Sequence, residues 1–379
     1  MELNINKGLL TDAIRKVNKA VSNRVVIPVL SGIHLVANDK GLIITGSDSN
    51  ISIRTFIGND NVDGAEILTE GSIVLPAKEL MNIARSMPDN NINIKVDENL
   101  ESVISSGKSK FTLNGVNGDQ YPELPSGEGD GFTVEGEALS DLIQRTSYAV
   151  ATMETRPVLT GVNLFFENDE IGMVATDSHR LSKFVGVKYE GTPLNESITI
   201  PEGALKQLPA LIKDAKEVTM KKQNNLFFIH TDKTIFFSRL IEGNYPETSR
   251  LIPNDNTTSL TVNRLDFLSA MERAAILIEK NSGAVTFKIS GESNGIFDTI
   301  ELSHQNNELG QSKEDIIVNK IDGEEVTLSF NPTFMIDALK RVDDNEVVIE
   351  FNGAMRPFLI KPMDRTVDFT QLILPVRTY

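Results

Sequence analysis

Two hydrophobic rhythms alternate along the chain. Six segments repeat apolar residues every three to four positions, a spacing typical of helices that bury one face. We predict these helices at residues 7–24, 76–87, 136–150, 201–216, 263–280 and 331–341. Between the helices, apolar and polar residues alternate in short runs bounded by Gly, Asn and Asp, which is typical of antiparallel strands. We predict these strands at residues 41–47, 51–57, 72–75, 91–96, 108–115, 170–175, 217–222, 226–230, 234–240, 284–289, 346–351, 357–361 and 369–374.

The pattern repeats at the spacing of a small domain. Pro28–Leu35 returns as Pro157–Leu164, and Asp48 returns as Asp177 at the same offset. Gly118–Glu123 is echoed by Glu242–Glu247, each with Tyr-Pro-Glu. A fainter third copy aligns Leu265–Leu268 with Leu139–Leu142 and places Asn331-Pro332 where Leu75-Pro76 and Ile200-Pro201 stand before it. Shared offsets of this kind indicate duplicated domains.

Three copies of about 125 residues account for the chain, and each has the usual size of a domain. Gly, Pro, Ser and Asp gather at residues 125–131 and 253–256, where we place the boundaries. The predicted domains are 1–126, 127–253 and 254–379. Each is an α+β unit in which two helices pack on antiparallel sheet.

Composition narrows the classes of function. The chain is 40% apolar and 24% charged, as ordinary globular proteins are, and its 379 residues include no cysteine. Disulfides, thiolate metal sites and cysteine nucleophiles are therefore excluded. The start lacks a basic and apolar leader and no run suits a membrane span, so we expect a cytoplasmic protein with no membrane association.

Charge is distributed unevenly between the predicted elements. The net charge of -16 argues against nucleic-acid binding by the whole surface. The six predicted helices nevertheless carry more Lys and Arg than Asp and Glu when taken together. Solvated helix faces often carry such residues, so this excess by itself leaves both a structural and a binding interpretation open.

Motifs of catalysis are missing. The chain has no phosphate-binding loop, no zinc-protease motif and no serine-nucleophile motif, and its four histidines lack metal-ligand spacing. Asp177 and His179 are close enough in sequence to act as an acid–base pair, which keeps an enzyme as the alternative hypothesis. A structural or binding role for His179 fits better, because no nucleophile shares its segment.

Several segments together resemble one known family. They are Ala175–Leu181 (ATDSHRL), Tyr245–Glu247 (YPE), Arg250–Pro253 (RLIP) and Gln371–Arg377 (QLILPVR). In this order and spacing they resemble the bacterial β sliding clamps, the processivity subunits of DNA polymerase III, and among these the type found in low-GC Gram-positive bacteria. A duplicate clamp of the kind that confers antibiotic resistance would show the same motifs.

The resemblance implies a DNA clamp without catalysis, metal or cofactor. Two chains would join head to tail, so that six domains close into a ring around double-stranded DNA without reading its sequence. A hydrophobic pocket between the second and third domains would bind peptides of the DNA polymerase III catalytic subunit, the clamp loader and other clamp-motif proteins, including repair proteins.

The resemblance also assigns residues to three sites. The peptide pocket would be formed by Leu159, Thr176, Ser178, His179, Arg180, Leu181, Pro246, Arg250, Leu251, Asn331, Phe334, Met355, Pro357, Leu372, Leu374, Pro375, Val376 and Arg377. Candidates for the DNA-facing surface are Arg24, Arg85, Lys206, Lys213 and Lys216. The dimer interface would pair Phe111 and Leu113, on a strand of the first copy, with Ile276 and Leu277, on a helix of the third.

Alternatives remain for some of these residues. Leu181 and Leu251 could equally belong to the core at a domain boundary. Gln371–Leu374 itself resembles a partner peptide, although the strand-like residues around it favour a place in the receptor. Two positions depart from the family: Ser178 stands where many relatives have Gly, and Pro157-Val158 stands where the enterobacterial clamp has two aromatic residues that contact DNA.

Overall fold

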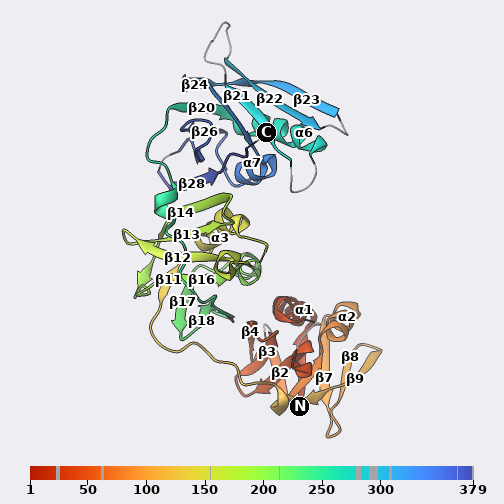
Figure 1. Cartoon of the computed structure of the whole chain (residues 1–379). Coiled ribbons are helices and arrows are strands. Elements are labelled where there is room, and N and C mark those ends of the chain that lie inside the picture. Colours follow the sequence, from red (N-terminus) through yellow and green to blue (C-terminus); the bar gives the residue numbers. More distant parts are fainter. Residues whose placement is uncertain are drawn as a thin grey trace. The chain divides into compact units, whose positions relative to one another are not determined.

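The computed structural model describes residues 1–22, 26–60, 64–153, 155–212, 214–278, 283–289, 298–306, 310–364 and 366–377. The chain, drawn in Figure 1 with colours that follow the sequence, divides into two compact units. The first contains Met1–Glu137, Glu190–Leu194 and Lys206–Leu240, and the second contains Ala138–Tyr189, Asn195–Leu205 and Ile241–Tyr379. The division runs through the middle of the second copy, so each unit combines one outer copy with part of the central one.

The first unit contains two antiparallel sheets. One has five strands in the order β5-β1-β7-β8-β9, with bounds Ala65–Thr69, Glu2–Asn6, Asn91–Val96, Glu101–Ser106 and Ser109–Asn114. The other has ten strands in the order β10-β6-β2-β3-β4-β19-β18-β17-β11-β15. Their bounds are Val116–Asn117, Gly71–Pro76, Gly32–Asn38, Gly41–Ser47, Ile51–Gly58, Thr234–Arg239, Leu226–His230, Val218–Gln223, Phe132–Val134 and Glu190–Gly191.

The second unit repeats the plan. Its nine-stranded sheet has the order β16-β12-β13-β14-β28-β27-β26-β20-β24, and its four-stranded sheet has the order β23-β22-β21-β25. The bounds of the first are Ile198–Pro201, Gly161–Glu167, Glu170–Thr176, Arg180–Lys188, Asp368–Ile373, Phe358–Pro362, Glu346–Phe351, Thr258–Asn263 and Lys320–Gly323. Those of the second are Gly310–Val318, Asp298–Asn306, Val285–Ile289 and Val326–Phe330.

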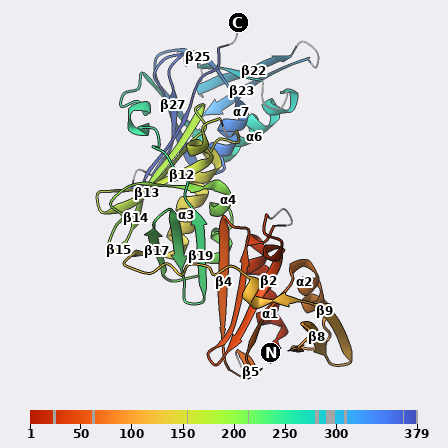
Figure 2. The ribbon, with the colours of Figure 1, turned by 60° about the horizontal axis from the view of Figure 1, so that its bottom comes forward.

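Each copy contributes two sets of strands with matching order. We call β6-β2-β3-β4, β16-β12-β13-β14 and β25-β21-β22-β23 the four-strand sets. We call β5-β1-β7-β8-β9, β15-β11-β17-β18-β19 and β24-β20-β26-β27-β28 the five-strand sets. The last strand of a four-strand set pairs with the last strand of the five-strand set of the next copy: β4 pairs with β19 (Figure 2) and β14 pairs with β28 (Figure 1). Backbone hydrogen bonds therefore join consecutive copies.

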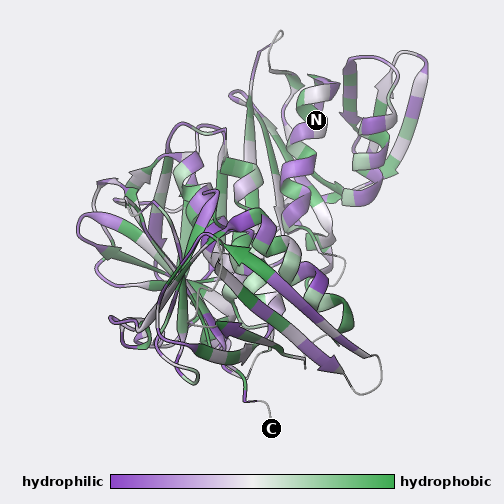
Figure 3. Cartoon of the chain, turned by 90° about the horizontal axis from the view of Figure 1, so that it is seen from above, coloured by the Kyte–Doolittle hydropathy of each residue, from purple (hydrophilic) through white to green (hydrophobic). Residues whose placement is uncertain are grey.

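The helices confirm the α+β prediction, and asparagine begins three of them. The side chains of Asn6, Asn263 and Asn331 accept backbone N–H groups at the starts of α1 (Lys7–Val17), α6 (Arg264–Ala274) and α7 (Pro332–Leu339). The other helices of the predicted pairs include α2 (Ala77–Ser86) and α3 (Gly136–Thr146). Hydrophobic residues recur along the helices at intervals that place them on one face (Figure 3).

One predicted helix is wrong in its length. The segment 201–216 forms two short helices, α4 (Glu202–Leu205) and α5 (Pro209–Ile212), instead of one. Pro209 lacks the N–H that a continuous helix requires, and its ring disfavours helical conformation in Leu208 before it. The chain therefore turns between the two helices and resumes at Pro209, a favourable first helical residue.

The core of the third copy is aromatic. Phe287 on β21 lies with its ring centroid 5.8 Å from Phe351, 6.0 Å from Phe330 and 6.1 Å from Phe267 on α6. All four side chains are buried. Aromatic rings at these separations attract one another beyond the burial of their area. Within the described ranges, no helix has the length and apolar content of a membrane span.

Candidate functional site

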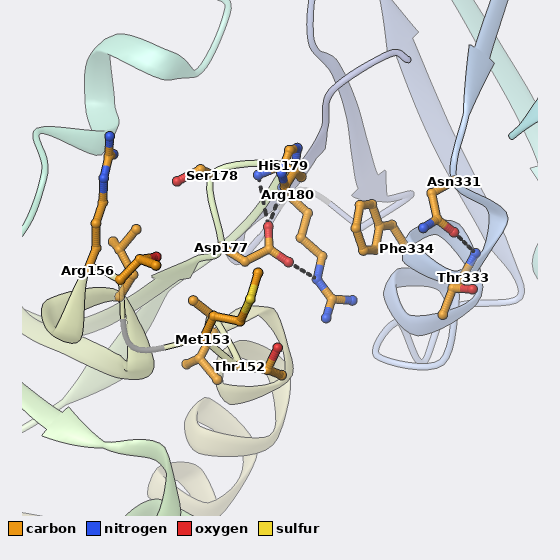
Figure 4. Close-up of a pocket in the computed structure, with 14 residues that line it drawn as sticks. Thr152, Met153, Arg156, Asp177, Ser178, His179, Arg180, Asn331, Thr333 and Phe334 are labelled. Atoms are coloured by element: carbon orange, nitrogen blue, oxygen red, sulfur yellow. Dashed lines mark hydrogen bonds and ion pairs between the residues drawn. The ribbon is translucent and has the colours of Figure 1, made fainter. Parts of the chain in front are cut away.

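A cavity of about 520 Å³ opens in the second unit beside the turn between β13 and β14 (Figure 4). Three segments surround it: the connection after α3, the turn at residues 177–180, and the first turn of α7. The lining residues are Val150, Ala151, Thr152, Met153, Thr155, Arg156, Leu159, Asp177, Ser178, His179, Arg180, Asn331, Thr333 and Phe334. A concave site with mixed apolar and polar walls of this size suits a peptide or small organic ligand.

The turn at residues 177–180 is held by its own side chains. Oδ1 of Asp177 accepts hydrogen bonds from the backbone N–H of His179 at 2.8 Å and of Arg180 at 2.9 Å. Thr176 Oγ1 accepts the N–H of Ser178 at 3.1 Å and donates to the carbonyl of Arg180 at 2.6 Å. These bonds fix Ser178 at φ +76°, a left-handed conformation that costs an L-residue about 1–2 kcal/mol.

The first copy contains the same turn. Oδ1 of Asp48 accepts the N–H groups of Asn50 at 2.9 Å and Ile51 at 2.8 Å, and Ser49 has φ +79°. The equivalence of Asp48 and Asp177 predicted from the sequence is therefore repeated in local geometry. Arg180 has no counterpart in this turn, because Ile51 stands at its position.

Arg180 connects the second copy to the third. Its Nε donates to Asp177 at 3.0 Å, its Nη1 to Asp337 at 2.6 Å and its Nη2 to the carbonyl of Tyr148 at 2.9 Å. The guanidinium carbon lies 4.7 Å from the ring centroid of Phe334 and 5.3 Å from that of Tyr148. Figure 4 shows the side chain extending between Asp177 and Phe334. Only 13% of this side chain is exposed, which strengthens both kinds of contact.

An apolar cluster lies across the junction of β14 and β28. Its buried members are Val174, Leu181, Leu359 and Leu372, and Phe165, Tyr245, Ile252 and Leu374 pack against them. The hydroxyl of Tyr245 accepts the N–H of Thr176 at 3.1 Å, and burial raises the pKa of this phenol. Tyr245 therefore remains a neutral phenol that ties the connection between the second and third copies to β13.

The structure separates the predicted pocket residues into three groups. Six line the cavity: Leu159, Ser178, His179, Arg180, Asn331 and Phe334. Thr176, Leu181, Leu372 and Leu374 belong to the turn or the apolar cluster. Pro246, Arg250, Leu251, Met355, Val376 and Arg377 are exposed, and Pro357 and Pro375 are partly buried. Of the two residues with a core alternative, Leu181 is 1% exposed and Leu251 is 49% exposed, so only Leu181 is a core residue.

Sequence reasoning missed one wall of the cavity. Residues 150–156 contribute Val150, Ala151, Thr152, Met153, Thr155 and Arg156. Met153 is 72% exposed, and an apolar side chain in a loop next to a repeated motif was the signal that could have indicated this wall. The sequence indicates Asp177 only as a candidate catalytic group, whereas both its carboxylate oxygens accept hydrogen bonds within the turn and from Arg180.

The predicted DNA-facing residues are only partly described. Arg85 is exposed in the last turn of α2, Lys206 is exposed after α4, and Lys216 is exposed before β17. Arg24 and Lys213 lie outside the described residues. All three described side chains sit at or near the ends of helical segments in their respective copies.

The predicted interface residues lie at two sheet edges. Phe111, 43% exposed, and Leu113 are on β9, the last strand of the five-stranded sheet. Ile276, 76% exposed, and Leu277 were expected on a helix; they occupy a 3₁₀ turn, Ala275–Leu277, that follows α6 and contacts β23. The change from α to 3₁₀ geometry tightens the end of the helix, as is common at helix C-termini.

Comparison with known proteins gives one consistent result. Sequence models of the N-terminal, central and C-terminal domains of the DNA polymerase III beta subunit match residues 1–125, 133–247 and 249–377. The beta sliding clamp of Bacillus subtilis is 40% identical over 386 residues, which cover 100% of both chains, and its crystal structure superposes with a TM-score of 0.92.

Two further solved structures are similar over their full length. The DNA polymerase III beta chain of Streptococcus pneumoniae has 35% identity and a TM-score of 0.94, with 100% of each chain covered. The sliding clamp of Pseudomonas aeruginosa, solved bound to griselimycin, has 26% identity and a TM-score of 0.90, again with 100% of each chain covered.

Proposed function

Because this chain belongs to the bacterial β sliding clamp family, the non-catalytic processivity subunits of DNA polymerase III, we propose a specific way in which it forms a ring and docks its partners. Two chains join head to tail around duplex DNA in the cytoplasm, and the cavity beside Ser178 binds peptides of the polymerase catalytic subunit, the clamp loader and repair proteins. The family assignment replaces the acid–base enzyme hypothesis for Asp177 and His179.

The main support for the proposed ring is that the strand sets of consecutive copies pair in the same way each time. The four-strand set of the first copy ends at β4, which pairs with β19, and that of the second ends at β14, which pairs with β28. The four-strand set of the third copy ends at β23, and the five-strand set of the first ends at β9. Both are terminal strands of their sheets, so β23 of one chain can pair with β9 of another by the same rule.

Exposed apolar side chains mark these two edges. Phe111 lies on β9, Ile317 on β23 is 62% exposed, and Ile276 beside β23 is 76% exposed. An unpaired strand that exposes apolar residues is a ready template for pairing with another chain. A β23–β9 joint formed twice connects two chains head to tail. Such a contact closes into a ring when the rotation that relates the two chains brings their free edges together.

Charge distribution supports enclosure of DNA without sequence reading. The chain carries -16 overall, whereas Arg85, Lys206 and Lys216 are exposed near helical segments. These cations, together with Arg24 and Lys213, are our candidates for contacts with phosphate, which position a duplex without specifying its sequence. The acidic remainder repels DNA that is not enclosed.

The cavity is suited to a short apolar peptide. It presents Leu159, Met153 and Phe334 as apolar surface beside the polar turn at residues 177–180. Peptide recognition typically relies on a few apolar anchors within a polar rim. Griselimycin, which is bound in the Pseudomonas aeruginosa relative, is a candidate ligand of this chain as well.

Retention on DNA tests the ring. The protein is loaded onto nicked circular DNA by a clamp loader and washed with high salt before and after the DNA is linearised. A closed ring stays on the circle and slides off the linear form, because enclosure does not depend on ionic contacts. Equal loss from circular and linear DNA would contradict the proposal.

A further inference from the structure

The cavity is assembled from two copies, and one guanidinium holds its walls together. The second copy supplies residues 150–159 and the turn at 177–180, and the third copy supplies the first turn of α7. Arg180 is attached to both: it donates to Asp177 and the carbonyl of Tyr148 on one side and to Asp337 on the other. Each nitrogen of the guanidinium therefore already donates a hydrogen bond within the protein.

Asp337 is the contact between Arg180 and α7. It stands three residues after Phe334, so both side chains lie on the same face of the helix. Phe334 lines the cavity and lies 4.7 Å from the Arg180 guanidinium, whereas Asp337 is not part of the cavity wall. The side chain of Asp337 is 37% exposed, and its 2.6 Å contact with Nη1 is a short charge-assisted hydrogen bond.

We propose that Asp337 is a positioning residue of the peptide site: it fixes the Arg180 guanidinium, and through it Phe334 and the turn at 177–180, in the arrangement that a peptide meets. Arg180 then acts mainly as part of the scaffold of the site. This inference rests on the proposed docking function of the cavity.

The energetic reason is preorganisation. Without the carboxylate, Arg180 keeps its bonds to Asp177 and Tyr148 but has only ring stacking to hold the first turn of α7. A binding peptide must then order Phe334 and the guanidinium, and the free-energy cost of this ordering weakens its binding. Loss of one charge-assisted hydrogen bond of this kind predicts a peptide affinity weaker by roughly tenfold.

A second arginine supplies a matched control. Arg145 on α3 also joins the second copy to the third, since its Nη2 donates to Asp343 at 2.6 Å and its Nη1 to the carbonyl of Arg341 at 3.3 Å. Its guanidinium lies 5.3 Å from both Phe184 and Phe369. Neither Arg145 nor Asp343 lines the cavity. Asp343→Asn therefore removes an arginine–carboxylate link between the same copies without touching the site, although the Asp343 side chain is 84% exposed and that of Asp337 is 37% exposed.

The test uses the full-length dimer and the synthetic peptide Gln-Leu-Ile-Leu-Phe, which repeats residues 371–374 and adds an aromatic anchor. Calorimetry or fluorescence polarisation gives its dissociation constant for the wild type, Asp337→Asn and Asp343→Asn. We expect roughly tenfold weaker binding to Asp337→Asn and a change within about twofold for Asp343→Asn. Thermal unfolding of all three proteins checks that the fold is kept, and Asp337→Glu, which retains the charge, should recover part of the affinity.

Alanine substitutions in the peptide separate positioning from general damage. If Asp337 positions one wall, replacing the peptide residues that meet this wall costs less in Asp337→Asn than in the wild type, whereas the other residues lose equal factors in both. Unchanged binding to Asp337→Asn, equal losses in Asp343→Asn, or a loss spread evenly over all peptide positions would each overturn the inference. A wild type that binds neither this peptide nor griselimycin would instead refute the docking function.

Discussion

Replacing Ile276 by aspartate should convert the proposed dimer into monomers. Ile276 is 76% exposed in the single chain and lies beside β23, one of the two edges assigned to the joint. Burying an isoleucine fully contributes about 1.5–3 kcal/mol, so about three quarters of this is lost at each joint. Bringing an unpaired carboxylate into an apolar contact adds a further cost of at least about 1–3 kcal/mol, which is the cost for a neutral polar group.

The two costs together reach at least about 2–5 kcal/mol per joint. A two-chain ring contains the joint twice, so Ile276→Asp should weaken dimerisation by about 4–10 kcal/mol, which is at least roughly a thousandfold. Sedimentation velocity at micromolar concentration should show the 41.7 kDa monomer in place of a species of twice that mass.

A partner variant and a control sharpen this experiment. Phe111→Asp on β9 should have the same effect. In a mixed dimer of the two variants, one joint carries both substitutions and the other carries neither, so an equimolar mixture should form a dimer of intermediate affinity. Met363→Asp, which changes a side chain that is 52% exposed after β27, should leave the dimer intact. A dimer of wild-type affinity for Ile276→Asp would refute the placement of the joint at β23.

Three further outcomes are expected. Ser178→Gly should relieve the strain of the left-handed backbone at φ +76° and, after the entropy cost of glycine is subtracted, raise the free energy of unfolding by about 0.5–1 kcal/mol. Ser49→Gly, at φ +79°, should have the same effect on stability, which thermal unfolding measures. Only Ser178→Gly should alter peptide affinity. Burial lowers the pKa of His34 to about 4 from 6.5, so the unfolded chain binds this proton at a higher pH than the folded chain does, and the free energy of unfolding should fall as the pH drops from about 6.5 to about 4. In urea titrations across this window, the dependence of the unfolding free energy on pH should become weaker in His34→Gln. An unchanged dependence would contradict the assignment to His34. Phe287→Ala should cost about 3–5 kcal/mol of unfolding free energy, because it empties the centre of the aromatic core of the third copy, and a loss below about 1 kcal/mol in denaturant titration would show that this core collapses to fill the space.

The sequence predicted elements best where local chemistry determines them. Strands Gly41–Ser47, Asn91–Val96, Leu226–His230 and Glu346–Phe351 have the predicted bounds, because each alternates between a buried and a more exposed face or is bounded by turn residues. Most of the described helices begin at or next to an asparagine or proline, which the sequence shows, and α3, which begins at Gly136, is the exception. By contrast, Arg180–Lys188 was not predicted as a strand, since buried residues on both of its faces remove the alternation that identifies a strand.

The candidate site also has parts that the sequence could predict and parts that it could not. The turn at residues 177–180 could be identified because Asp177-Ser178 repeats Asp48-Ser49 and because the motif around it matches a family. The wall at residues 150–156 combines small and apolar residues with Arg156 and matches no binding or catalytic motif, so that only Met153, an apolar residue in a loop beside a repeated motif, could have indicated it. The bond from Arg180 to Asp337 spans 157 positions of sequence and depends on the packing of two copies, so no local pattern could indicate it.

Hydrogen bonding of β4 to β19 has a consequence for how the chain can be cut. The connection at residues 121–131 links the first two copies along the chain, and the β4–β19 strand pair links them by hydrogen bonds. A protease cleaving near Gly129 would leave fragments that stay associated under native conditions and separate only in denaturant. A circular permutant with its new ends at this point, in which a linker follows the third copy and leads into a first copy across the proposed β23–β9 joint, should assemble into the same ring. The order of the copies in the gene could then change without a change in the ring.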